Sequence, residues 1–255
     1  MNDQQRLYHD LAWAWPIISP PQGYVEETEQ LCSIIQGHSR LEARTLLNLG
    51  CGGGHNDFTL KEHFDVTGVD TSEAMLKLAR QLNPEVSYLA GDMRTVRLHT
   101  TFDVVTIFDS VNYMVTVQDL RSAFMTAFAH LRPGGVFLTV VEATPERFEQ
   151  NWTQCSTHTG GDVEIAFIEN SYDPDLTDTA YEVTFVYLIR RGGRLEVETD
   201  RHVCGIFALE TWRGLLKEVG FEVSEMEFTY NVGGARTYPV FVCVKPPQRA
   251  SGKGT

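Results

Sequence analysis

One stretch decides the fold: Leu46-Leu47-Asn48-Leu49-Gly50-Cys51-Gly52-Gly53-Gly54, followed by Val66-Thr67-Gly68-Val69-Asp70. An apolar run meets a cluster of glycines, and a second apolar run ends in an acid twenty residues after Gly50. This order predicts strand, tight turn, helix, strand and carboxylate, the first half of a nucleotide-binding α/β unit. The glycines tolerate positive φ and let the backbone approach a ligand closely, and the carboxylate can accept hydrogen bonds from both hydroxyls of a ribose.

The spacing of the glycines separates two classes of cofactor. A dinucleotide site requires GxGxxG because its third glycine packs the helix against the strand. Here the spacing is GxGxG, at Gly50, Gly52 and Gly54, and the bulky His55 stands where that third glycine would be. The pattern favours a ligand with a ribose but no pyrophosphate, such as S-adenosylmethionine (SAM). A glycine-rich turn without a ligand is the alternative that this stretch alone leaves open.

Three later stretches extend the α/β pattern. The segments Ser87–Asp92, Phe102–Asp109 and Leu131–Leu138 predict a third, a fourth and a fifth strand. Ligands of open α/β sheets bind outside the carboxyl ends of the strands. The acids at the strand ends are therefore expected to converge on one crevice: Asp70, Asp92 and Asp109.

Taken together, these motifs resemble those of the class I SAM-dependent methyltransferases. The resemblance rests on the glycine turn, Val69–Leu76, Gly91–Met93, Phe102–Val105 and Leu131–Gly135, and it is strongest over residues 46–140. It implies an α/β fold, with a Rossmann-like seven-stranded, mostly parallel sheet whose last strand is antiparallel. It also implies SAM as the cofactor.

The resemblance further implies which residues hold SAM. The glycine turn would pass under the methionine portion, and Asp109 would lie close to it. Asp70 would hold the ribose hydroxyls, Asp92 would accept from the adenine amino group, and Met75 would pack near the adenine. The full expected set is Tyr8, Tyr24, Gly50, Cys51, Gly52, Gly54, Asp70, Thr71, Met75, Gly91, Asp92, Met93, Phe108 and Asp109.

Composition narrows the partners. The chain has 255 residues, 42% of them hydrophobic, and a formal net charge of -13, which suits one large domain or a domain with a long insertion. The nearest approach to a basic cluster is Arg190-Arg191, so nucleic acid and anionic membranes are excluded as expected partners. The charge favours a neutral or cationic small molecule as acceptor.

The cysteines and the N-terminus bear on location. The five cysteines form no CxxC motif and no paired spacing with histidine, which predicts reduced thiols that behave as small buried hydrophobes. The first ten residues are polar, and no run approaches about twenty apolar residues. We therefore expect a cytoplasmic protein.

The chain is expected to divide into four parts. Residues 1–37 would form an N-terminal helical lid, with Tyr8 and Tyr24 over SAM. Residues 38–141 and 208–245 would form the SAM-binding core, with helices near 55–62, 73–81, 118–130 and 210–218. Residues 142–207 would form an inserted antiparallel sheet of three strands with a hairpin at Arg191–Arg194, capping the core and walling the substrate. Residues 246–255 would be a disordered tail.

This arrangement is similar to the branch that N-methylates nucleotide-linked amino sugars. There too the fifth strand ends in Val-Glu, here Val141-Glu142, and a Pro-Glu-x-Phe stretch follows, here Pro145–Phe148. That branch tends to carry a histidine after the fourth strand, where this chain has Tyr113. An amino-sugar acceptor therefore does not follow from the resemblance alone.

Methyl transfer places few demands on the protein. SAM brings the reactivity, and the protein supplies position, desolvation and sometimes a base. The candidate bases are Tyr113, after the fourth strand, and His158 and His202, in the insertion. An aromatic wall for Tyr113 and a surface or core position for the histidines are the alternatives. No metal-binding motif is present, so no metal is expected.

The sequence thus predicts a SAM-dependent methyltransferase acting on the N or O nucleophile of a small molecule. Two alternatives remain: a non-catalytic SAM-binding regulatory protein on the same fold, and a nicotinamide-dependent oxidoreductase, against which the GxGxG spacing argues. The identity of the acceptor, the use of a base, and the choice between monomer and homodimer stay open.

Overall fold

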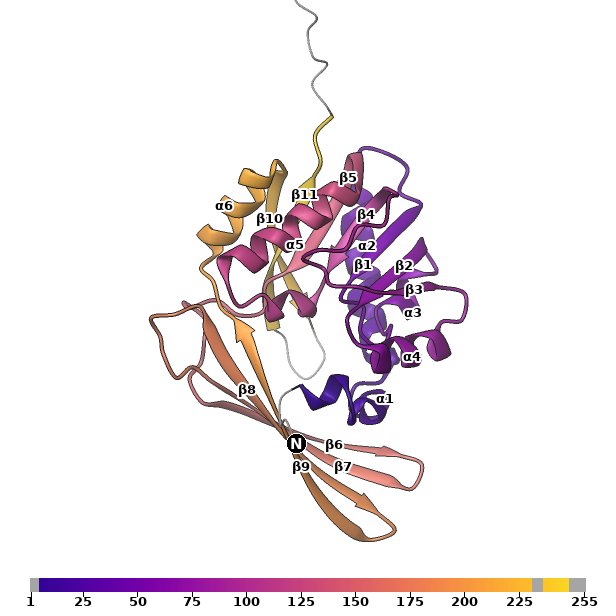
Figure 1. Cartoon of the computed structure of the whole chain (residues 1–255), viewed down its shortest axis with the longest axis vertical. Helices are drawn as coiled ribbons and strands as arrows, with labels where there is room; N and C mark the ends of the chain where they lie inside the picture. Colours follow the sequence, from indigo (N-terminus) through magenta and orange to yellow (C-terminus); the bar gives the residue numbers. More distant parts are fainter. Residues whose placement is uncertain (1–4, 231–235, 248–255) are drawn as a thin grey trace, which may run out of the picture.

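The computed structural model describes residues 5–230 and 236–247 and contains two sheets (Figure 1). The large sheet has the order β10-β11-β5-β4-β1-β2-β3, and the small sheet has the order β6-β7-β8-β9. The large sheet is parallel from β3 to β5 and antiparallel at β11 and β10. Its strands are β1 (Thr45–Leu49), β2 (Asp65–Asp70), β3 (Ser87–Ala90), β4 (Phe102–Ile107), β5 (Leu131–Val140), β10 (Glu222–Tyr230) and β11 (Arg236–Val244). The predicted fold class is confirmed.

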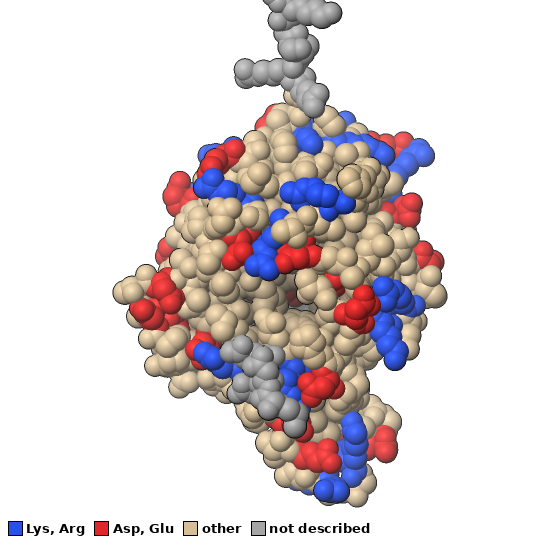
Figure 2. All heavy atoms as spheres, in the orientation of Figure 1, with Lys and Arg blue, Asp and Glu red and all other residues tan. Residues whose placement is uncertain are grey.

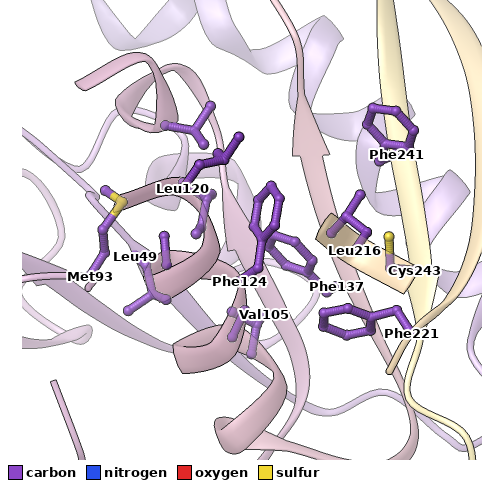
Figure 3. Close-up of a cluster of buried hydrophobic side chains, with 14 of the residues drawn as sticks. Leu49, Met93, Val105, Leu120, Phe124, Phe137, Leu216, Phe221, Phe241 and Cys243 are labelled. Carbon is purple, nitrogen blue, oxygen red and sulfur yellow. The ribbon is translucent and has the colours of Figure 1, made fainter. Parts of the chain in front are cut away.

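Helices cover both faces of the large sheet. One face packs on α5 (Val117–His130) and α6 (Leu209–Val219), as the aromatic cluster of Figure 3 shows. The other face packs on α2 (Val25–His38) and α4 (Glu73–Leu82), and a short α3 (Asp57–Leu60) follows the glycine turn. Strands buried on both sides explain why the sequence of the core reads as continuous apolar runs.

Local signals set the ends of these helices. The Ser72 hydroxyl caps α4 by accepting from the Met75 N–H, and Thr116 caps α5 in the same way. Gly220 ends α6 with φ of 113°, the left-handed conformation that glycine adopts without strain. The helix expected over 55–62 is shorter in the structure, because half of that segment, residues 55–56 and 61–62, forms turns on either side of α3.

The inserted sheet has four strands, not the three expected. They are β6 (Trp152–Gly160), β7 (Val163–Tyr172), β8 (Ala180–Arg191) and β9 (Arg194–Gly205). The first strand was missed because its sequence, WTQCSTHTG, is polar and mostly exposed and carries no apolar alternation. The expected hairpin between β8 and β9 is present, with φ of 54° at Gly192 and 81° at Gly193.

The N-terminal segment lies between the two sheets (Figure 1). It runs through η1 (Arg6–Tyr8), η2 (Ala12–Ala14), α1 (Trp15–Ile18) and η3 (Pro21–Tyr24) before α2. Leu7 and Leu11 pack with Tyr187 and Ile189, two of the apolar residues that alternate along β8. The segment enters α2 through the 3-10 turn η3, which places Pro21 at its first position.

Two further points concern the C-terminal tail and membrane-spanning helices. The tail expected over 246–255 lies outside the described residues from 248 onward. Among the described helices, none is long and apolar enough to span a bilayer.

Candidate active site

A cavity of about 570 Å³ lies where the carboxyl ends of the parallel strands meet the N-terminal segment and the inserted sheet. The space-filling view in Figure 2 shows a hollow near the middle of the face that it draws. One end of the cavity is formed by the glycine turn and by the residues after β2 and β3. The other end is formed by the loop after β4, by Glu142 after β5, and by the inner face of β8 and β9.

The glycine turn is tied to β2, since the N–H groups of Gly50 and Cys51 donate to the Val69 carbonyl at 2.7 and 3.0 Å. At Gly52, with φ of 53°, a Cβ would meet no atom within 4 Å, so the backbone there is open. At Gly54 a Cβ would lie 2.7 Å from the Tyr88 hydroxyl. Gly52 therefore lines the cavity, whereas Gly54 packs against β3, which does not agree with the expected place of Gly54 beside the cofactor.

Asp70 ends β2 at the wall of the cavity. Its Oδ2 accepts from the Gly52 N–H and its Oδ1 accepts from the Ser72 N–H, both at 2.8 Å. Burial raises the pKa of Asp70, against the opposing effect of those backbone donors. Asp70 lines the cavity, and an ionised carboxylate can accept about four hydrogen bonds, so it can also take a hydroxyl donor. A fixed carboxylate beside the open backbone of Gly52 fits the ribose and chain of SAM.

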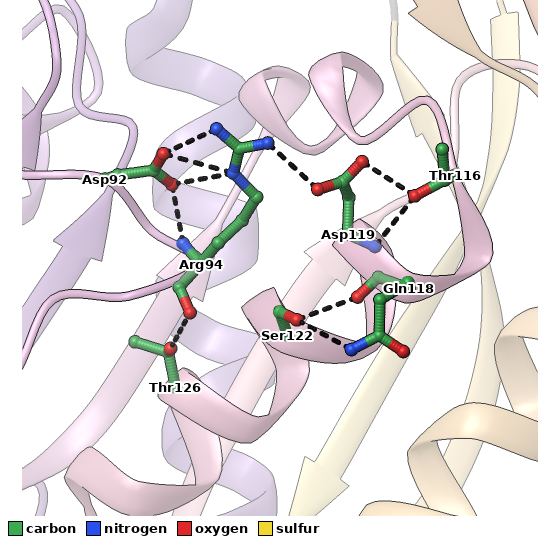
Figure 4. A network of polar contacts seen from close by, with 7 residues as sticks. All are labelled: Asp92, Arg94, Thr116, Gln118, Asp119, Ser122 and Thr126. Carbon is green, nitrogen blue, oxygen red and sulfur yellow. Dashed lines mark hydrogen bonds and ion pairs between the residues drawn. The ribbon is translucent and has the colours of Figure 1, made fainter.

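The residues after β3 form a charged network at the same end (Figure 4). Arg94 binds both oxygens of Asp92, with contacts from 2.6 to 3.1 Å, and reaches Asp119 at 2.9 Å. The hydrogen bonds from Arg94 hold the pKa of Asp92 below its usual value. Asp92 therefore faces the cavity as an ionised group that already has a cationic partner, and any adenine would share it with Arg94.

Carboxyl groups gather at the opposite end. Asp109 and Glu142 hydrogen-bond to each other, and the Asn112 amide donates to Glu142. Burial raises the pKa of both acids, and the charge of Asp109 raises that of Glu142 further. Burial, and then the charge of Asp109, raise the pKa of Glu27 on α2 to about 7. Such close carboxyls cannot all ionise, so the group retains a proton.

Tyr113 lies beside these acids, at the end of η4 (Asp109–Tyr113). Its hydroxyl is 2.6 Å from His202 Nδ1 and 2.8 Å from the Tyr8 hydroxyl. His202 Nε2 is 2.7 Å from Asp200 Oδ2. Burial raises the pKa of Tyr113 well above its usual value, so the phenol is neutral at pH 7. The chain has Tyr113 after β4, and β9 brings the imidazole of His202 within hydrogen-bond distance of it.

The remaining expected residues can now be placed. Thirteen of the fourteen residues expected around the cofactor line the cavity, and Gly54 is the exception. His158 lies on β6, where its Nε2 is 2.7 Å from the Ser156 hydroxyl, and it does not line the cavity. Of the three candidate bases, the structure therefore brings Tyr113 and His202 together and leaves His158 apart.

His55, directly after the glycine turn, stacks on Trp15 with ring centroids 5.5 Å apart, and burial lowers the pKa of His55 to about 4, so it is neutral. Three further residues of the site carried no sequence signal. Glu169 lines the cavity, Asp200 binds His202, and Glu27 lies close enough to Asp109 to feel its charge. These three residues belong to three different elements. None of them belongs to a motif, because only the folded chain brings them together.

The remaining groups of chemical interest are the thiols and the side chains that could bind a metal. All five cysteines are free, and all are buried except Cys155, which the exposed strand β6 presents to solvent against expectation. Within the described parts of the chain, no group of three or more His, Cys, Asp or Glu residues could hold a metal ion.

Comparison with known proteins decides the family. Residues 46–135 match the model of a methyltransferase domain. A Geobacillus protein assigned to the methyltransferases is 30% identical over 221 residues, 83% of this chain and 88% of its own length. The chain belongs to the class I SAM-dependent methyltransferases. It is an enzyme with SAM as its cofactor, and neither a nicotinamide-dependent oxidoreductase nor a non-catalytic SAM-binding protein agrees with this match.

Other relatives of this methyltransferase have named substrates. The dTDP-3-amino-3,4,6-trideoxy-alpha-D-glucopyranose N,N-dimethyltransferase of Streptomyces venezuelae is 29% identical over 80% of this chain and 86% of its own. The structure of DesVI from the same species has a TM-score of 0.80 at 25% identity, covering 94% of this chain and 97% of that one. SAM-bound CalS10, an amino pentose methyltransferase of Micromonospora echinaspora, has a TM-score of 0.77 at 27% identity, covering 93% and 96%.

Proposed function

We propose that this methyltransferase moves the methyl group of SAM to the amine nitrogen of a small-molecule acceptor held between the loop Asp109–Tyr113 and the inserted sheet. The observation that carries the proposal is the chemistry of that end of the cavity. It is lined by the carboxyl groups of Glu142 and Glu169 and by Tyr113. Among the described lining residues the one Lys or Arg side chain is Arg94, which two carboxylates already bind.

The cofactor end follows from the same geometry. In this proposal Asp70 accepts from the ribose hydroxyls, and the open backbone at Gly52 lies along the methionine portion. Met75 and Met93 line the cavity where an adenine would lie. The carboxyls of Asp109 and Glu27 suit the amino group of the cofactor, because a positive charge there stabilises the ionised forms that burial disfavours. When bound, SAM supplies an electrophilic methyl group on a sulfonium.

The acceptor nitrogen must offer a free lone pair, so a proton has to leave it. Tyr113 is a neutral phenol, and it can take up that proton only while it passes its own to another base. His202 Nδ1, 2.6 Å away, is in place to receive it. The N–H proton then moves to the Tyr113 oxygen as the phenolic proton moves to His202, and Asp200 stabilises the resulting imidazolium.

Each part of the chain has a role in this proposed reaction. The N-terminal segment, 1–37, acts as the lid over SAM, and the insertion, 142–207, is the wall over the acceptor. The core, 38–141 and 208–245, holds the cofactor. The cluster that joins Tyr181, Val183 and Cys204 beside the cavity supports this role of the insertion. The free thiols support a reducing compartment, which in this proposal is the cytoplasm.

An amino sugar is the acceptor class to test, because relatives similar over most of this chain carry it in their names. The enzyme is incubated with SAM and a dTDP-linked 3-amino sugar, with the matching 3-hydroxy sugar, and with small amines that lack a nucleotide. Mass spectrometry then finds the methylated product. We expect methyl groups on an amine and none on the hydroxy sugar. Methylation of the hydroxy sugar alone would contradict the proposal.

On the face drawn in Figure 2, the described basic side chains are interspersed with acidic ones and form no continuous patch. A nucleic-acid acceptor would need such a patch to bind the phosphates. The mixed surface and the net charge of -13 support a small molecule as the acceptor.

A further inference from the structure

We infer that Asp200 is a positioning residue, which fixes the Tyr113–His202 pair and anchors the N-terminal segment with the same carboxylate. The inference rests on the proposed function for the part played by Tyr113. Asp200 lies in β9, on the same side of the strand as His202, because side chains two residues apart share a face. Both residues are 1% exposed.

The carboxylate of Asp200 accepts three hydrogen bonds. Its Oδ1 accepts from the Arg6 N–H at 2.8 Å, and its Oδ2 accepts from the Leu7 N–H and from His202 Nε2, each at 2.7 Å. A buried carboxylate is costly unless such donors surround it. Two of these donors belong to the N-terminal segment, and the third belongs to the candidate base His202. The negative charge of Asp200 therefore holds both the segment and the histidine in place.

The bond to Asp200 decides which nitrogen of His202 carries the proton. An ionised carboxylate only accepts hydrogen bonds, so Nε2 must be the protonated nitrogen of the neutral ring. Nδ1 is then an acceptor, and the Tyr113 hydroxyl must be its donor. The lone pairs of the Tyr113 oxygen are thereby left for the Tyr8 hydroxyl and for a donor in the cavity. Without Asp200, the ring has no partner that selects this tautomer.

The N-terminal segment is held at a second place beside the cofactor site. The Ser72 hydroxyl is 2.5 Å from the Tyr8 carbonyl, and the Ser72 N–H donates to Asp70. The same three residues, Arg6–Tyr8, therefore touch Asp200 on one side and the α4 N-terminus on the other. The position of this segment beside the cofactor site and the tautomer of His202 therefore both depend on Asp200.

Glu198 provides a matched control. It lies two residues before Asp200 in the same strand, and its carboxylate binds the Arg6 side chain at 2.7 Å, whereas the carboxylate of Asp200 binds His202. The variant Glu198→Gln loosens the segment through its side chain, and Asp200→Asn removes the carboxylate that joins the segment to the histidine.

The experiment uses the full chain without acceptor. Nitrogen-15 NMR of the histidine side chains reports the tautomer of His202, whose signal is assigned by its loss in His202→Gln, and hydrogen exchange reports the Arg6 and Leu7 amides. We expect the Nε2–H tautomer in the wild type and in Glu198→Gln. In Asp200→Asn we expect loss of that single tautomer and amide exchange faster by about tenfold or more, since bonds to a charged acceptor are lost.

The Nδ1–H tautomer in the wild type would overturn the inference, and this outcome does not depend on the folding of Asp200→Asn. An unchanged tautomer and unchanged exchange in a folded Asp200→Asn would also overturn it. With an acceptor from the amine panel, Asp200→Asn should lower kcat by roughly a hundredfold, as misplacement of a reacting group does, and Glu198→Gln should not. Failure of every amine in that panel rejects the proposed function, while the NMR result still stands by itself.

Discussion

Asp70 illustrates how one residue combines a structural and a binding task. Its two backbone hydrogen bonds fix the glycine turn against α4, and its remaining lone pairs face the cavity. We expect Asp70→Ala to weaken SAM binding by about 1.5–3 kcal/mol, the usual contribution of hydrogen bonds to a charged group. Isothermal titration calorimetry checks this value. Wild-type affinity in a folded variant would reject Asp70 as the ribose ligand.

Glu27 gives a prediction about pH. Burial places its pKa at about 7 in the folded protein, above the ordinary value of 4.5. Its contribution to stability is therefore complete below about pH 4.5 and is lost as the pH rises through 7, where the folded state must carry the charge. Without SAM, Glu27→Gln should be more stable than the wild type at pH 8, by at most about 3 kcal/mol. The difference should vanish near pH 4.5.

Denaturant unfolding at several pH values measures this difference. A stability difference between Glu27→Gln and the wild type that stays constant from pH 4.5 to pH 8 would show that the carboxyl is not perturbed. The same variant should bind SAM more weakly if Glu27 helps to hold the amino group.

Gly52 and Gly54 form a matched pair within one turn. Gly52 faces open space, so Gly52→Val should keep a cooperative fold and lose SAM binding, because its side chain would occupy the cofactor's path. Gly54→Ala places a Cβ 2.7 Å from the Tyr88 hydroxyl and should destabilise the fold by about 1–3 kcal/mol. Calorimetry and thermal unfolding separate the two effects. Normal SAM binding by Gly52→Val would show that the turn does not approach the cofactor.

At the scale of elements, the loop after β4 and the strand β9 build the acceptor end together. Tyr113→Phe removes the hydroxyl that binds both Tyr8 and His202. We expect kcat to fall by up to roughly a hundredfold, with little change in the affinity for SAM, because the hydroxyl faces the acceptor. His158→Ala, on the remote strand β6, should leave both quantities unchanged. Full activity of Tyr113→Phe would make Tyr113 only an aromatic wall.

The sequence was sufficient to predict an element of the fold wherever a local pattern coincides with a buried strand. Local signals of this kind mark the glycine turn, the acids at the ends of β2 and β4, and the alternating strand β8. The polar strand β6 carries none, because its exposed side chains need no apolar face. Gly54 shows the converse case, in which a glycine belongs to the motif and yet serves packing.

The candidate site was harder to predict than the fold, because its polar contacts cross long distances in the sequence. Tyr113 and His202 are 89 residues apart, and Asp200 meets Leu7 across 193 residues. No spacing rule links such pairs, so the sequence could suggest Tyr113 and His202 as separate candidates but not as partners. Asp200 and Glu27 had no signal at all.

At the scale of the whole molecule, two sheets and the N-terminal segment enclose one continuous cavity. The carboxyl ends of the parallel strands supply the cofactor end, as expected for an open α/β sheet. The inserted sheet supplies the opposite wall, and the segment Arg6–Tyr8 lies between them (Figure 1). In the proposed function, the methyl group is therefore transferred toward the end of the cavity that holds Tyr113 and Glu142.

A crystal structure with S-adenosylhomocysteine bound would locate the point of transfer in the cavity, because its sulfur marks where the methyl group leaves. We predict that the ribose lies on Asp70 and that the sulfur faces the acid end, with the Tyr113 hydroxyl no more than one water molecule away. A sulfur that faces Arg94, or one separated from Tyr113 by more than one water molecule, would contradict the account.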